Sequence, residues 1–319
     1  MSRALEFGFR LSPYARFVDV ADLLDTVVFG EELGFDVVAL PEHLLPPAAP
    51  DEPKWTKVWY DQATLSAFLA ARTRRIVFMP GVHVAPYHPP VQAAKALATL
   101  DVLSGGRVRL AVGVGWLKGE FERLAIPYEE RGAITDEYIQ AMRELWTSEN
   151  PSFLGRYVAF DDVSFLPRPV RREGIPIYIG GTGPRPFRRV AEFGNGWYPM
   201  TVSPAELRAG IEEIGRLMIA RGRDPESLWV GCSFEAGDDP ELEQLRRNVR
   251  LPAGSGALVS DGVMTSEPSR RTPGECIRGI EEFRDGGAKL IIVGFGWRNG
   301  ADLREELRWF AHEVIPAFR

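Results

Sequence analysis

Two adjacent residues near the start of the chain, Glu42 and His43, have side chains that can move protons. They follow a short apolar run, residues 37–40, that is typical of a buried strand. Histidine changes charge near neutral pH, so it can act as a general acid or base. We therefore predict Glu42 and His43, at a strand end, as catalytic residues. The alternative is structural, because a histidine close to a proline is often held in place for packing alone.

Two further histidines, His83 and His88, follow another apolar run, residues 76–79, and the Pro-Gly-Val stretch after it. Either histidine can take part in chemistry, or it can cap a turn or stack on a neighbouring ring. The sequence alone leaves both interpretations open.

Glycines surround the end of an apolar run that reaches residue 114. Gly113 and Gly115 flank Val114, and the large planar side chain of Trp116 follows directly. Where side chains are missing, a flat ring or a phosphate can approach the backbone closely. The stretch is typical of a shelf for a cofactor, although a core strand that ends in an ordinary glycine turn would have the same pattern.

A second glycine-rich stretch, Gly180-Gly181-Thr182-Gly183, joins a predicted strand to a predicted helix. The first backbone N–H groups of a helix have no partner inside the helix and attract an anion. Arg185, Arg188 and Arg189 follow in the helix and can add positive charge. We predict a phosphate site at Gly180, Gly181 and Thr182. The alternative is a tight turn followed by surface arginines.

The chemistry that the protein side chains can perform unaided is limited. A metal-dependent hydrolase needs several histidines and carboxylates around its metal, whereas this chain has four histidines, one of them in the last predicted helix. The sequence has no G-x-S-x-G motif for a serine nucleophile, and Lys289 lies at the start of its strand rather than at the end. We therefore predict an organic cofactor and no metal.

Composition limits the partners and the compartment. The net charge of −6 argues against a surface for nucleic acids, and no run is long and apolar enough to span a membrane. The two cysteines, Cys232 and Cys276, lie far apart without the spacing of a metal site, which is typical of a reducing compartment. We expect a cytoplasmic protein that acts on a small organic molecule, without nucleic-acid or membrane partners.

Strands alternate with helices along the whole chain and must position the residues above. Residues 92–116 illustrate the pattern with an apolar helix stripe, a Ser-Gly-Gly stop and a β-branched run. Strands are predicted at residues 5–10, 37–40, 76–79, 108–114, 177–179, 197–200, 228–234 and 290–293. Helices are predicted at residues 19–33, 61–72, 92–104, 120–146, 184–193, 203–220, 273–285 and 302–317.

Eight strands, each followed by a helix, predict an α/β fold, a (β/α)8 TIM barrel with insertions, whose active site lies at the C-terminal strand ends. An open doubly wound sheet is the alternative, but no glycine-rich phosphate turn follows the first strand. We expect one domain over residues 1–319, because no linker or change of composition divides the chain. Residues 150–175 are predicted as a small excursion of strand and turn, and the polar residues 236–272 as a lid.

Several segments resemble one known family, in the same order along the chain. They are ELGFDVVALPEHLLPP, AKALATLDVLSGGRVRLAVGVGW, the pair Glu120-Phe121, the triplet Glu130-Arg131-Gly132, and IPIYIGGTGPRPFRRVAEFGNGWYP. Together they resemble the luciferase-like monooxygenase superfamily, well over residues 5–200 and loosely beyond. The GR followed by GVGxGW is similar to the branch that uses the deazaflavin coenzyme F420, although Ala111 stands where that branch commonly has glycine.

The resemblance implies where such a cofactor would lie. It implies a non-prolyl cis peptide at Gly81-Val82 that backs the ring, with Glu42 and His43 near the ring and the substrate. It places the cofactor tail along Gly113–Gly115 and its phosphate on Gly180–Thr182. The full set of expected cofactor-binding residues is Gly81, Val82, Gly113, Val114, Gly115, Trp116, Gly180, Gly181 and Thr182.

Three functions remain open at this point. The first is an oxidoreductase that transfers a hydride between coenzyme F420 and an organic substrate. The second is a monooxygenase that receives FMNH2 from a separate flavin reductase, and the third is a non-catalytic flavin-binding protein. Sugar-phosphate dehydrogenases of the F420 branch have an acidic residue about where Trp116 stands, so we expect an apolar substrate. The resemblance also implies a homodimer.

Overall fold

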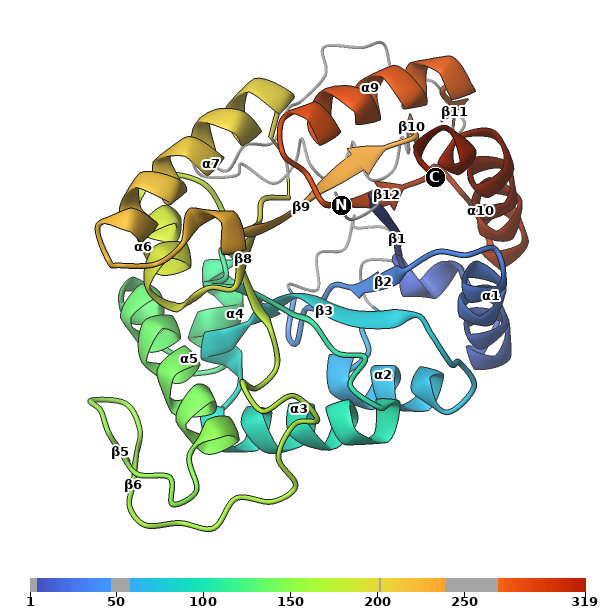
Figure 1. Ribbon diagram of the computed structural model, residues 1–319. Coiled ribbons are helices and arrows are strands. Elements are labelled where there is room, and N and C mark those ends of the chain that lie inside the picture. The colour runs from blue at the N-terminus through green and yellow to red at the C-terminus, as the bar shows by residue number, and fades with distance from the viewer. Residues whose placement is uncertain (1–4, 47–57, 201, 239–268) are drawn as a thin grey trace.

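The chain folds around a closed barrel of parallel strands that is surrounded by helices (Figure 1). The computed structural model describes residues 5–46, 58–200, 202–238 and 269–319. Around the barrel the strands lie in the order β1-β12-β9-β8-β7-β4-β3-β2, so that the first barrel strand pairs with the last. The prediction of a (β/α)8 barrel is therefore confirmed.

The eight barrel strands are short and buried, as a parallel sheet covered by helices requires. Their bounds are β1 (Glu6–Arg10), β2 (Val37–Leu40), β3 (Val77–Val84), β4 (Leu110–Gly113), β7 (Ile177–Gly180), β8 (Gly196–Tyr198), β9 (Trp229–Glu235) and β12 (Leu290–Gly294). All lie within four residues of the predicted positions except at the end of β3, which runs five residues further than expected.

The α-helices follow these strands, and several begin or end at caps that the sequence supplies. Ser203 and Thr272 each form a full capping box, and Gly105 ends its helix with φ +70°. The helices are α1 (Val20–Glu32), α2 (Gln62–Ala70), α3 (Pro90–Ser104), α4 (Lys118–Arg123), α5 (Arg131–Thr147), α6 (Pro184–Phe193), α7 (Pro204–Ile219), α9 (Pro273–Asp285) and α10 (Gly300–Glu313). Short 3-10 turns are η1 (Tyr14–Arg16), η3 (Ala85–Tyr87), η4 (Tyr128–Glu130), η5 (Pro225–Ser227) and η6 (Ile315–Phe318).

Two predicted elements differ from the structure. The helix expected over residues 120–146 is divided into α4, η4 and α5, because Pro127 disfavours helical backbone at the residue before it and Ala125 has φ +55°. Strand β3 continues past Met79, and its register against β4 shifts between Gly81 and His83. The Gly81–Val82 peptide within this stretch is cis, which confirms the prediction from the family resemblance.

Two insertions leave the barrel pattern. Strands β5 (Phe153–Leu154) and β6 (Ala159–Phe160) form the small antiparallel excursion that was predicted within residues 150–175. Strands β10 (Gly237–Asp238) and β11 (Ser269–Arg270) pair at the base of the second insertion. The lid prediction for residues 236–272 concerns mainly residues 239–268, which lie outside the described residues.

Apolar side chains alternate between the two faces of each strand and form two core layers. Val37 and Ala39 of β2 join a cluster with Tyr178, Leu290 and Ile292, whereas the intervening Val38 and Leu40 join the larger cluster that the helices cover. Both faces of the barrel strands are therefore packed. No helix among the residues that the structure describes is long and apolar enough to cross a membrane.

Candidate active site

A cavity of about 410 Å³ opens at the C-terminal ends of β2, β3, β4 and β7. We call it the strand-end cavity. Its wall is mostly apolar, with few charged groups, as is usual for a site that holds an organic ligand. The structure places all of the sequence-predicted site residues on this wall, namely Glu42, His43, Gly81, Val82, Gly113, Val114, Gly115, Trp116, Gly180, Gly181 and Thr182.

The glycines of the cavity make room for protein side chains. A Cβ added to Gly113 would lie 2.9 Å from a methyl of Val82, and one added to Gly180 would lie 3.0 Å from the other methyl. Gly115, with φ +76°, is equally crowded by Val84 and Phe121. We expected the missing side chains to admit a ring or phosphate. At Gly113 and Gly180 the side chain of Val82 takes up this space instead. The two glycines thereby leave room for Val82 in the last part of β3.

His43 is paired with a carboxylate that the sequence did not suggest. Its Nδ1 lies 2.8 Å from Oε2 of Glu120, which is 77 residues away in α4. The side chain of His43 is 22% exposed, whereas that of Glu120 is fully buried. Because Nδ1 is engaged by the carboxylate, Nε2 is the ring nitrogen left for a molecule in the strand-end cavity.

Glu120 is held as an ionised carboxylate by its surroundings. Its Oε1 accepts hydrogen bonds from the backbone N–H groups of Leu44 and Leu45, at 2.8 and 3.0 Å. Its Oε2 accepts a bond from the hydroxyl of Tyr87 at 3.0 Å as well as facing His43. Burial raises the pKa of Glu120, but these hydrogen bonds outweigh burial and keep the pKa below its usual value. The carboxylate can therefore stabilise a positive charge on His43.

Two tryptophans border the His43 ring. Trp59 lies edge-on at a centroid distance of 4.8 Å, and Trp116 lies perpendicular to the ring at 6.2 Å. Trp116 is 38% exposed and lines the strand-end cavity. Trp197 of β8, by contrast, is fully buried and donates from Nε1 to the Gly181 carbonyl at 2.8 Å.

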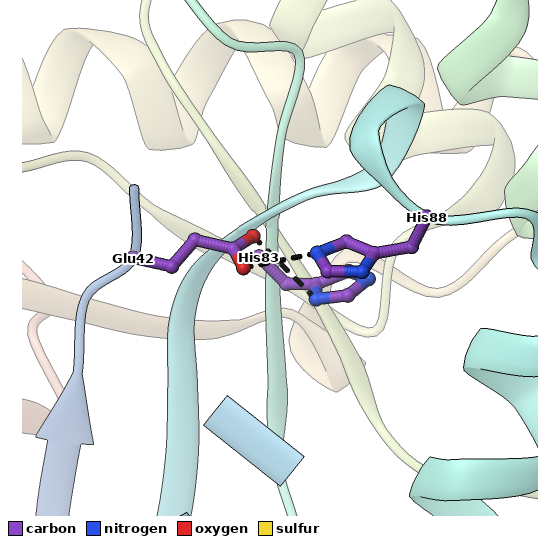
Figure 2. Close-up of side chains that lie close together, drawn as sticks. All are labelled: Glu42, His83 and His88. Carbon is purple, nitrogen blue, oxygen red and sulfur yellow. Dashed lines mark hydrogen bonds and ion pairs between the residues drawn. The ribbon is translucent and has the colours of Figure 1, made fainter. Parts of the chain in front are cut away.

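Glu42 has different partners from His43, although the two are adjacent in sequence. Its Oε1 accepts a hydrogen bond from the Val84 N–H at 2.5 Å, and its Oε2 lies 2.9 Å from Nε2 of His88. Nδ1 of His83 lies 3.7 Å from Oε1. Figure 2 shows the carboxylate pointing toward both imidazole rings, which are stacked at a centroid distance of 4.3 Å. The two histidines that the sequence left open thus belong to one cluster with Glu42.

The spacing of this Glu42–His83–His88 cluster would suit a metal ion, since three ligand atoms lie within 4.8 Å of one another. The same atoms are already used in hydrogen bonds, however. Val84 and His88 occupy the two carboxylate oxygens, and Gln62 Oε1 lies 3.2 Å from His83 Nδ1. Glu42 is thus engaged by Val84 and His88, and His83 is engaged by Gln62.

The predicted phosphate site lies at the start of α6. Gly183 precedes the helix with φ +95°, and a Cβ on it would meet nothing within 4 Å, so the backbone is open there. Of the three arginines considered, Arg189 lines the strand-end cavity and is 4% exposed. Asp136 orients it through an ion pair with Nε. Arg188 is engaged by Asp136 and Glu192, and Arg185 is exposed.

The luciferase-like monooxygenase family matches residues 6–289, which is most of the chain. This match decides the relationship. The chain belongs to the luciferase-like monooxygenase family.

Curated relatives of this luciferase-like chain use two kinds of cofactor. This chain is 29% identical to an F420-dependent glucose-6-phosphate dehydrogenase from Nakamurella multipartita, and the alignment covers 99% of this chain and 97% of the relative. This chain is also 28% identical to an FMNH2-dependent dimethylsulfone monooxygenase from Pseudomonas putida, and that alignment covers 82% of this chain and 79% of the relative. The predictions of an F420- or flavin-dependent oxidoreductase and of its cofactor are confirmed at the level of the family.

Solved structures support the same fold for this luciferase-like chain. An F420-dependent secondary alcohol dehydrogenase in complex with an F420-acetone adduct superimposes with a TM-score of 0.78, over 99% of this chain and all of the other. Sequence identity in that comparison is 20%, so the similarity concerns the fold alone.

The residues of the strand-end cavity fit a cofactor with a flat ring and a phosphate. Val82, Val114 and Trp116 give the wall apolar surface for a ring, and Arg189 gives a positive charge for a phosphate near the start of α6, where Pro184 and Pro186 have no N–H to donate. Sequence reasoning missed Glu120 and Tyr87 as neighbours of His43. Glu120 was noted only as part of the Glu120-Phe121 motif, and no local pattern indicates that its carboxylate turns toward β2.

Proposed function

We propose that this protein transfers a hydride between coenzyme F420 and a small, largely apolar organic substrate. The observation that carries the proposal is the His43–Glu120 pair at the wall of an apolar cavity. A hydride transfer between a carbon and a cofactor needs an acid or base at the substrate oxygen, and a histidine oriented by a buried carboxylate is suited to this role.

In the proposed reaction the bound deazaflavin supplies or accepts the hydride. His43 Nε2 takes the proton from a substrate hydroxyl, or returns it to a carbonyl oxygen in the reverse direction. Glu120 holds the Nδ1–H and stabilises the imidazolium that forms. Tyr87 donates to Glu120 and so fixes the direction in which the carboxylate faces.

We assign the other cavity residues to cofactor binding. Gly81 and Val82 would support one face of the ring, and Gly113–Gly115 would line the path of the tail. Gly180, Gly181 and Thr182, together with Arg189, would hold the phosphate. Trp116 would cover the substrate side, where an acidic residue would be needed for a sugar phosphate.

The alternative is an FMNH2-dependent monooxygenase served by a separate flavin reductase. The 28% identity with the dimethylsulfone monooxygenase and the apolar wall of the cavity favour it. The proposal of an F420-dependent enzyme rests on the stretch similar to GVGxGW and on an F420-dependent relative aligned over 99% of the chain. A non-catalytic flavin-binding protein would not require His43 to be paired with a buried carboxylate.

Calorimetry and fluorescence quenching with purified protein separate these functions. We expect micromolar binding of oxidised F420 and no binding of FMN, followed by turnover when secondary alcohols and ketones are screened with the cofactor. Preference for FMN would replace the proposal with the monooxygenase. Binding of neither cofactor would overturn the enzymatic proposal.

We further propose one barrel domain over residues 1–319, a homodimer and a cytoplasmic location. The closed barrel joins the start and the end of the chain through the β1–β12 pair, which supports a single domain. Both cysteines, Cys232 and Cys276, are buried free thiols, as expected in a reducing compartment. Sedimentation of the purified chain tests the dimer.

A further inference from the structure

A second cavity lies beside the strand-end cavity, behind β3. It has a volume of about 220 Å³ and is bordered by Asp61, Gln62, His83, His88 and Gln92. We call it the side cavity. Asp61 and Gln92 are exposed, so the side cavity opens to solvent. None of the roles proposed above uses it.

Glu42 and His88 connect the two cavities. Glu42 is 5% exposed and lines the strand-end cavity, while its Oε2 lies 2.9 Å from Nε2 of His88. His88 in turn lines the side cavity. A hydrogen-bonded pair of a carboxylate and an imidazole (Figure 2) thus lies between the strand-end cavity and the side cavity.

The neighbouring His83 is fixed in a neutral form. Gln62 donates from Nε2 to the Leu40 carbonyl at 2.6 Å, so its Oε1 is the atom that accepts the proton of His83 Nδ1. Nε2 of His83 is then an acceptor, and within the described part of the chain this buried atom has no hydrogen-bond partner.

We propose that Glu42 and His88 form a proton path between the strand-end cavity and the side cavity. The proposal rests on the proposed function, because the path would serve a group in the strand-end cavity that gains or loses a proton during the proposed reaction. The Nε2 proton of the His88 imidazolium moves to Oε2 of Glu42, which leaves a neutral imidazole and a carboxylic acid. The acid gives that proton to the group in the strand-end cavity, and His88 regains a proton from water in the side cavity. The reverse sequence removes a proton.

The charges around His88 suit this exchange. Burial lowers the pKa of His88, but the hydrogen bond and charge of Glu42, together with Asp61, outweigh burial and raise it above its usual value. His83 stays neutral, because burial lowers its pKa to about 4. Tyr14 and Tyr87, the other titratable groups facing Glu42, have pKa values raised by burial and stay neutral. Near neutral pH His88 is therefore the histidine of this cluster that carries an exchangeable proton.

The test follows protonation of a bound cofactor directly, without a substrate. Protein is loaded with chemically reduced F420, or with reduced FMN if the chain prefers it. Stopped-flow absorbance then records how fast the bound ring responds to a pH jump across neutrality. We compare the wild type with His88→Gln, which keeps an N–H donor near Glu42 but cannot relay a proton, and with Glu42→Gln. His312→Gln, an exposed histidine of α10, is the matched control.

We expect the protonation rate to fall at least tenfold in His88→Gln and in Glu42→Gln and to be unchanged in His312→Gln. In His88→Ala, added imidazole should restore the rate, because the side cavity is large enough to admit it. A wild-type rate in a folded His88→Gln variant, judged by its thermal unfolding, would overturn the proton path while leaving the proposed function intact. Failure of the wild type to bind either cofactor would instead overturn the proposed function and the path with it.

Discussion

The imidazole of His43 and the carboxylate of Glu120 lie 2.8 Å apart at the C-terminal end of the barrel, joined Nδ1 to Oε2. One comes from the end of β2 and the other from α4, after β4. The pair fixes the tautomer of His43 and leaves Nε2 for the substrate, so the chemistry of the site depends on both residues.

The first prediction concerns this pair. In Glu120→Gln the amide can present N–H to His43 Nδ1, which forces the ring proton to Nε2 and removes the base. We expect turnover to fall roughly 100-fold, within the usual contribution of acid–base catalysis, with little change in KM. Histidine nitrogen NMR should show the tautomer change without any substrate. Glu122→Gln, an exposed change in the same helix, is the control and should leave both readouts unaltered. An unchanged tautomer in Glu120→Gln would contradict the assignment.

The second prediction concerns the space that Val82 occupies. In Gly113→Ala the new Cβ would lie 2.9 Å from Val82 Cγ2, so Val82 must move. We expect cofactor Kd to rise at least tenfold and the free energy of unfolding to fall by about 1–3 kcal/mol, as in overpacked cores. Fluorescence titration and urea unfolding measure the two effects. Gly215→Ala in α7 is the control, because its new Cβ would lie 3.6 Å from the nearest atom, an ordinary contact. This variant should leave the cofactor Kd unchanged. Equal Kd values for the wild type and Gly113→Ala would remove the proposed role of Val82.

The third prediction concerns stability at acid pH. The folded chain keeps His83 neutral down to a pKa of about 4, whereas the unfolded chain binds that proton below 6.5. Unfolding therefore becomes more favourable as the pH falls from 6.5 to 4, by about 3 kcal/mol from this residue. His83→Asn, which retains an N–H for Gln62, should show a smaller loss of stability over this range. Urea unfolding at several pH values measures the slope, and an identical slope in the two proteins would refute the prediction.

His88 affects stability in the opposite direction. Its raised pKa means that its contribution is fully present below 6.5 and is lost as the pH rises through the folded value. Carboxyl groups with shifted pKa values, such as Asp36 and Asp101, also titrate at acid pH, so the difference in slope between the wild type and His83→Asn is what isolates His83. His312→Asn, on the exposed side of α10, provides the control for the loss of a histidine.

The fourth prediction concerns the anion site at α6. Inorganic phosphate should raise the Tm of the wild type, because a ligand that binds only the folded state stabilises it. Arg189→Gln should abolish this rise and weaken cofactor binding at least tenfold, since Arg189 borders the cavity at the open helix start. Arg185→Gln, an exposed change in the same helix, should behave like the wild type. A full phosphate effect in Arg189→Gln would exclude Arg189 from the site.

The sequence by itself determined the elements of this protein and most of the cavity wall. Strands and helices follow from apolar periodicity and from caps such as Ser203 and Thr272, which act over a few residues and can be recognised locally. The ends of the strands then fixed which residues meet, because all parallel strands of a barrel end on the same face. Gly81-Val82 was found through the family resemblance, and its cis peptide is present.

Only the tertiary structure decided the partners of each side chain. Glu42 and His43 are adjacent, yet successive residues point in different directions, so one meets His88 and the other Glu120. Val82 fills the space left by Gly113 and Gly180, which come from two other strands. These contacts depend on barrel closure, on the register shift in β3 and on the direction of α4. They join residues far apart in the chain, so no local pattern of residue types could specify them.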